Sequence, residues 1–164
     1  MNTRRHLLAA AAALWLPTQS RAGPVDWYNG VKVGSKLPEY EAHYLNTPPS
    51  SSARLFVIDF WATWCAPCRE HIPTFNTWHE KYASQGLSIL GLTKEKAEVV
   101  TPFMAKVSML YPVGVGDAKS LQSALGIKAL PYAIFVDRSR TIIWRGQPGD
   151  MNEGLVESLL RNAA

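Results

Sequence analysis

The sequence has few cysteines and no long apolar run. Only two of its 164 residues are cysteine, which is too few for a disulfide-rich scaffold. No apolar stretch reaches the roughly 18–20 residues that span a membrane. The eleven glycines and eleven prolines follow no period, which excludes a collagen-like chain. Because 47% of the residues are hydrophobic and 18% are charged, we expect one folded globular domain rather than a disordered chain.

An excess of charge of one sign is also lacking beyond residue 22. The sequence has 17 Lys and Arg residues against 13 Asp and Glu residues. Three of the basic residues, Arg4, Arg5 and Arg21, lie in the first 22 residues, which contain no acid. The remainder has 14 basic and 13 acidic side chains. It therefore has no strong positive charge that would attract nucleic acid or an anionic membrane.

The first 22 residues are typical of an export signal. Arg4 and Arg5 precede an apolar core of ten residues at Leu7–Leu16, which is long enough for a signal peptide and too short to span a bilayer. Ser20 and Ala22 place small residues where a signal peptidase cuts. We predict a cleaved signal peptide at residues 1–22, a mature domain at residues 23–164, and a periplasmic location. The arginine pair fits either twin-arginine or Sec export, and a membrane-anchored form is the alternative.

Strand and helix patterns alternate in the remaining chain. Leu55–Trp61 is a nearly continuous apolar run, typical of a central strand buried on both faces. Ile72, Phe75, His79 and Tyr82 then fall on one face of a helix. Other expected elements are an extended piece at Pro38–Ala42, strands at Leu87–Leu92, Tyr111–Val115, Tyr132–Val136 and Thr141–Trp144, a solvated helix start at Lys94–Lys96, and helices at Thr101–Met109, Lys119–Leu125 and Glu153–Asn162, the last capped by Asn152. This order predicts an α/β sandwich with a mixed sheet.

Both cysteines lie where the predicted central strand leads into a helix, in the segment Trp64-Cys65-Ala66-Pro67-Cys68. The free N–H groups and the dipole at a helix N-terminus favour a thiolate, so we expect Cys65 to be the nucleophile. Cys68 lies one turn further on and can close a small ring with Cys65 as the resolving thiol. Pro67 suits a first helical turn. Such a pair predicts thiol–disulfide exchange.

The same pair also fits a metal site or a structural disulfide. Zinc needs about four ligands, and the chain has one cysteine pair. A copper(I) site could use Cys65, Cys68 and His71, which follows Cys68 by three residues. A purely structural disulfide is also conceivable, but closing so short a loop contributes little chain entropy.

The segment V-I-D-F-W-A-T-W-C-A-P-C-R-E-H-I-P resembles the active-site segment of thioredoxins, in particular that of exported thioredoxin-like proteins of the TlpA, ResA and CcmG type. The resemblance extends over about Gly34–Arg161 and includes Pro73, at the position where thioredoxins kink the active-site helix. It implies a thioredoxin-like three-layer sandwich, a mixed β-sheet flanked by helices, with an N-terminal extension. It also implies a monomer that reduces disulfides of exported partner proteins, is re-reduced by a membrane thiol donor, and needs no metal or other cofactor.

The resemblance assigns roles to further residues. Pro131 would follow a cis bond and pack against the cysteine pair, and the backbone of Leu130 would pair with an extended substrate segment. Asp59 would accept the proton of Cys68. Trp64 would shield the cysteines and contact substrate.

The sequence also departs from several relatives. Ala66 and Pro67 supply no histidine between the cysteines, unlike the dipeptides of strongly oxidising relatives, so the couple should be reducing. Gly126–Ala133 lacks the acidic residue of the cytochrome c maturation branch, and the glutamate that ResA carries between its cysteines is also absent. A disulfide oxidase or isomerase, or a copper(I) chaperone, are the alternative functions.

Overall fold

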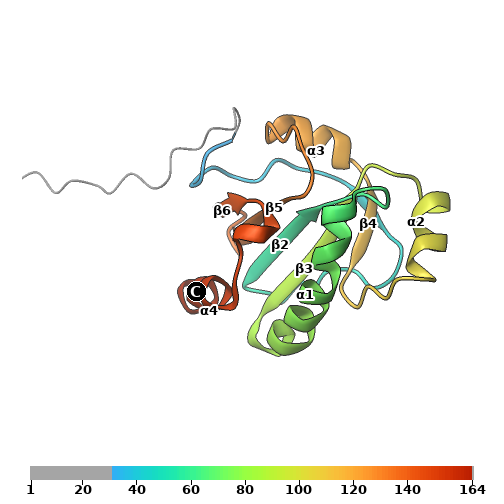
Figure 1. Ribbon diagram of the computed structural model, residues 1–164. Coiled ribbons are helices and arrows are strands. Elements are labelled where there is room, and N and C mark those ends of the chain that lie inside the picture. The colour runs from blue at the N-terminus through green and yellow to red at the C-terminus, as the bar shows by residue number, and fades with distance from the viewer. Residues whose placement is uncertain (1–30, 164) are drawn as a thin grey trace, which may run out of the picture.

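Residues 31–163, which the computed structural model describes, form a six-stranded mixed sheet with helices on both faces (Figure 1). The strands are β1 (Ala42–Tyr44), β2 (Leu55–Phe60), β3 (Leu87–Thr93), β4 (Val113–Gly116), β5 (Tyr132–Asp137) and β6 (Ile142–Gly146). The helices are α1 (Ala66–Tyr82), α2 (Ala97–Met104), α3 (Ala118–Ala124) and α4 (Glu153–Asn162), with 3-10 turns at Ala83–Gln85 and Pro148–Asp150. The predicted signal peptide lies outside the described residues.

Strand β2 lies inside the sheet, whose order is β1-β4-β3-β2-β5-β6. It runs parallel to β3 and antiparallel to β5, and Asp59 is opposite Gly91 on one side and Ala133 on the other. Five of its six residues are apolar, and five of the six are buried. The prediction of a central strand buried on both faces is therefore confirmed.

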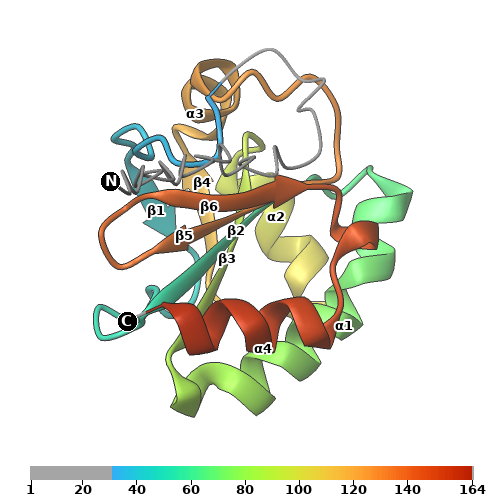
Figure 2. The same ribbon diagram turned by 90° about the vertical axis from the view of Figure 1, so that its left-hand side faces the viewer.

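Helix α3 lies on one side of the sheet, and α1 and α4 lie on the other (Figure 2). The buried side chains accordingly form two core layers, one on each face. Val57 and Trp61 belong to the layer under α1, α2 and α4, whereas Ile58 and Phe60 belong to the layer under α3. Because side chains alternate along a strand, Asp59 points to the same face as Val57 and Trp61. This places its carboxyl group on the side of the sheet that α1 covers.

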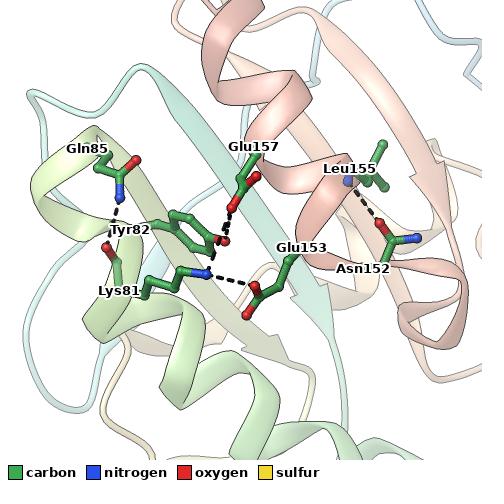
Figure 3. A network of polar contacts seen from close by, with 7 residues as sticks. All are labelled: Lys81, Tyr82, Gln85, Asn152, Glu153, Leu155 and Glu157. Atoms are coloured by element: carbon green, nitrogen blue, oxygen red, sulfur yellow. Dashed lines mark hydrogen bonds and ion pairs between the residues drawn. The ribbon is translucent and has the colours of Figure 1, made fainter.

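The C-terminal end of α1 is joined to α4 by a polar network (Figure 3). Lys81 Nζ lies 2.7 Å from Glu153 Oε2, and the Tyr82 hydroxyl donates to Glu157 at 2.9 Å. Asn152 caps α4 by accepting from the backbone N–H of Leu155, as the sequence predicts. The Lys81–Glu153 pair is half exposed, so solvent screening leaves it little effect on stability. Burial of Val156 and Leu160 holds α4 on the sheet.

Three elements differ by two or more residues from their predicted start. Helix α2 begins at Ala97 and ends at Met104, earlier than the expected Thr101–Met109, because Pro102 lies inside the helix rather than in its first turn. Strand β4 begins only at Val113, since Pro112 has no N–H to donate to the strand ladder. The carbonyl oxygen of Pro112 still accepts a hydrogen bond from Gly91 N. The extended piece near Pro38 becomes a short edge strand at Ala42–Tyr44.

None of the helices in the described range is long and apolar enough to cross a membrane.

Candidate active site

The cysteine pair lies at the N-terminus of α1, as predicted. Cys65 is the N-cap residue of the helix, and its Sγ accepts a hydrogen bond from the backbone N–H of Cys68 at 3.3 Å. Pro67 lies in the first turn, and Pro73 lies inside the helix. A free helix N–H therefore points at the Cys65 sulfur, which is the arrangement that stabilises a thiolate.

Cys65 and Cys68 are joined by a disulfide in this structure, with their Cα atoms 5.3 Å apart. The two residues are 4% and 2% exposed, whereas the neighbouring Trp64 is 66% exposed. Trp64 is therefore a large apolar side chain exposed to solvent directly beside the buried pair.

Asp59 is buried beneath this end of the sheet. It is 2% exposed, and its Oδ1 atom has no hydrogen-bond partner among the described residues. Burial raises the pKa of Asp59 from 3.8 to about 8, because a charged carboxylate is poorly solvated in an apolar core. An acid with this pKa is matched to exchange a proton with a thiol, whose ordinary pKa is about 8.5.

The segment before β5 lies at the same edge of the sheet as the cysteines. The Leu130–Pro131 peptide bond is cis, as the sequence predicts. Tyr132 opens β5 and is opposite Phe60, the last residue of β2. Because β5 runs antiparallel to β2, the residues that precede β5 lie beside the turn that follows β2.

Glu95 is a site residue that the sequence analysis missed. Its carboxylate accepts hydrogen bonds from Thr63 N at 2.6 Å and from Thr63 Oγ1 at 2.8 Å. Thr63 lies two residues before Cys65, so Glu95 holds the turn that carries Trp64 and Cys65. The expected solvated helix start at Lys94–Lys96 is therefore wrong for Glu95, which is partly buried. A signal for this contact was available, because the ends of parallel strands such as β2 and β3 meet at one edge.

The described residues contain no group of three His, Cys, Asp or Glu side chains that could hold a metal ion. In this disulfide form, Cys65, Cys68 and His71 are thus not assembled as a ligand set. The His71 ring instead lies near Phe75, with the ring centroids 6.5 Å apart.

Comparison with known proteins identifies the family of the chain. Residues 33–145 match the family model described as the AhpC/TSA family. The chain is 26% identical over 103 residues to the thiol-disulfide oxidoreductase ResA of Bacillus thuringiensis subsp. konkukian. The aligned region covers 62% of this chain and 60% of that protein. It is 25% identical over 121 residues to the thioredoxin-like protein YneN of Bacillus subtilis, covering 69% of this chain and 70% of that protein. The chain thus spans about three fifths of the length of this ResA protein.

Solved structures show the same fold at low sequence identity. The thioredoxin domain of a thiol-disulfide oxidoreductase from Bacteroides vulgatus superposes with a TM-score of 0.71 at 19% identity, covering 80% of this chain and 99% of that one. A thiol:disulfide interchange protein from Bacteroides sp. gives the same score and identity, covering 80% and 91%. These likenesses confirm the predicted thioredoxin-like fold. The chain has a thioredoxin-like fold and belongs to the AhpC/TSA family.

Proposed function

We propose that this protein is a thiol–disulfide oxidoreductase that reduces disulfides of exported partner proteins. The observation that carries the proposal is the Cys65–Cys68 pair at the N-terminus of α1, where the sulfur of Cys65 accepts a helix N–H. The names of the relatives, thiol-disulfide oxidoreductase and thiol:disulfide interchange protein, support it.

The reaction begins from the reduced pair. The Cys65 thiolate attacks one sulfur of the substrate disulfide and forms a mixed disulfide, and the other substrate sulfur leaves as a thiolate. Cys68 then loses its proton and attacks the Cys65 sulfur. This step forms the Cys65–Cys68 disulfide seen in the structure and releases the second substrate thiolate. Two electrons pass from the cysteine pair to the substrate.

The surrounding residues have distinct proposed roles. Asp59 accepts the Cys68 proton, since its raised pKa lies near that of a thiol. Trp64, the exposed side chain beside the buried pair, contacts the partner protein. The backbone of Leu130, ahead of Pro131 at the same sheet edge, pairs with an extended substrate segment.

Trapping of the mixed disulfide tests this function. In a Cys68→Ala variant the second step is blocked, so partner proteins should remain covalently bound to Cys65 and be identified by mass spectrometry. A Cys65→Ala variant is the matched control and should trap none. If the purified protein instead forms a stable copper(I) complex and does not speed insulin reduction by dithiothreitol, the copper chaperone is correct.

The cellular setting is part of the same proposal. A periplasmic protein with a reducing couple works in an oxidising compartment, so a membrane thiol donor must re-reduce its disulfide. Fractionation with N-terminal sequencing should find a mature chain that begins near Gly23 outside the cytoplasm. A cytoplasmic protein that retains Met1 or Asn2 would contradict the proposed export.

A further inference from the structure

Three buried polar groups around Gly91 have no hydrogen-bond partner among residues 31–163. They are the Oδ1 atom of Asp59, the indole N–H of Trp61 and the hydroxyl of Tyr111. Buried polar atoms in native proteins are nearly always hydrogen-bonded. Three such atoms in one part of the core therefore point to a polar site with a use, rather than to a simple packing region.

The backbone explains why these groups lie together. Gly91 is directly opposite Asp59 on β3, at a separation of about 5 Å between neighbouring strands. A Cβ atom on Gly91 would lie 3.1 Å from Trp61 Nε1 and 3.1 Å from Tyr111 Cε2. The indole N–H and the phenol ring therefore close over the space that Gly91 leaves beside the Asp59 side chain.

The charges around Asp59 leave it dependent on neutral donors. Burial is the cause of its raised pKa, and no charged neighbour contributes. Strands β3 and β5 place the uncharged Gly91 and Ala133 opposite it. The titratable side chains buried in this core layer are those of Tyr82 and Tyr111, whereas the cysteine pair of α1 is joined as a disulfide and does not titrate. Burial, and then the nearby Asp59, raise the pKa of Tyr111 well above its ordinary value, so its hydroxyl stays a neutral donor.

We propose that Tyr111 is a positioning residue for Asp59: its hydroxyl and the Trp61 indole N–H act, through one buried water, as hydrogen-bond donors toward the ionised Asp59 carboxylate. The proposal rests on the proposed role of Asp59 as the proton acceptor. Donors stabilise the charged form of a carboxyl group, so they let Asp59 exist as a base in an apolar core. The transferred proton moves from Cys68 Sγ to Asp59, while Tyr111 and Trp61 keep their own protons.

The first test follows the Asp59 carboxyl carbon by ¹³C NMR through a pH titration of the oxidised full-length chain. Tyr111→Phe keeps the ring and removes only the hydroxyl, so the titration midpoint of Asp59 should rise by about one pKa unit through loss of a hydrogen bond to a charged group. Tyr82→Phe is the matched control, because Tyr82 is buried in the same core layer but donates to Glu157 (Figure 3). An unchanged midpoint in Tyr111→Phe, or an equal rise in Tyr82→Phe, would overturn the proposal.

The second test separates this inference from the proposed function. The rate measured is that of Cys68 resolving the mixed disulfide between Cys65 and a substrate near pH 7. This rate should fall about tenfold in Tyr111→Phe. The reason is that Asp59 titrates above pH 7, so its ionised fraction falls tenfold for each unit by which its pKa rises. The same change in an Asp59→Asn background should have no further effect. A shifted NMR midpoint with an unchanged release rate would support the Tyr111–Asp59 contact and overturn Asp59 as the proton acceptor.

Discussion

Replacing Asp59 with Asn should stabilise the oxidised protein at neutral pH. The Asp59 pKa is about 8 in the folded protein and 3.8 ordinarily, so the unfolded chain releases this proton near pH 4 while the folded protein keeps it. Between these values the unfolded state binds fewer protons, and stability falls as the pH rises. The loss is about 1.4 kcal/mol per pH unit, which amounts to about 4 kcal/mol at pH 7. Above the folded-state pKa of Asp59, the free energy of unfolding no longer falls with pH on account of this group.

Urea unfolding of the oxidised protein between pH 5 and pH 8 measures this effect. The difference in the free energy of unfolding between Asp59→Asn and the original protein should grow by about 3 kcal/mol from pH 5 to pH 7. Asn has nearly the same size and carries no titrating proton, so packing changes should be small and independent of pH.

Asp137→Asn on the neighbouring strand β5 is the control. Burial alone would raise the pKa of Asp137, but hydrogen bonds from Thr141 and Ser139 lower it overall. Asp137 is therefore ionised in both the folded and the unfolded protein above pH 5, and its replacement should leave the pH dependence as it was. If the Asp59→Asn difference is the same at every pH, or if the variant is less stable at pH 7, the reasoning from burial is wrong.

Three further predictions concern the cysteine pair and its turn. Glu95→Ala should lower the free energy of unfolding, measured in urea, by about 1–3 kcal/mol through loss of the two hydrogen bonds from Thr63. Glu95→Gln should lose less stability because its amide oxygen still accepts a hydrogen bond. An equal loss of stability in the two variants would argue against the contact. In the reduced protein, Cys65 should be alkylated by iodoacetamide before Cys68, with a pKa below about 8.5; mass spectrometry that finds Cys68 modified first would contradict the helix-terminus argument. Equilibration with glutathione should give a potential nearer about −270 mV than about −120 mV, since no positive group lies between the cysteines to stabilise the Cys65 thiolate. A value above about −170 mV would favour the oxidase alternative.

The main elements of the fold could be predicted because their signals are local. The apolar run at Leu55–Trp61, the alternation of strands and helices, and the cap at Asn152 each depend on a short stretch of sequence, and the structure confirms them. The bounds of α2 and β4 were missed because prolines lie near both. Pro102 is tolerated inside a short helix, although local preference disfavours it there. Pro112 lies immediately before β4, because it has no N–H for the strand ladder.

The residues of the site divide in the same way. The helix-terminal position of Cys65 and the cis bond at Pro131 follow from short motifs, and the structure shows both. The bonds between Glu95 and Thr63 cross 32 residues of sequence. They become predictable only when β2 and β3 are known to be parallel neighbours. The grouping of Tyr111 with Asp59 depends in addition on a glycine at the facing position of β3, which has no local signature.

One row across the sheet brings these observations together. Ala133, Asp59, Gly91 and Val113 are consecutive partners on β5, β2, β3 and β4. The carboxyl group is thus flanked by the two smallest side chains in the row, and no charged group lies opposite it. Any larger residue at position 91 would occupy the space over which Trp61 and Tyr111 close. A carboxylate in this core therefore depends on the small size of its strand neighbours, which leaves neutral donors room to reach it.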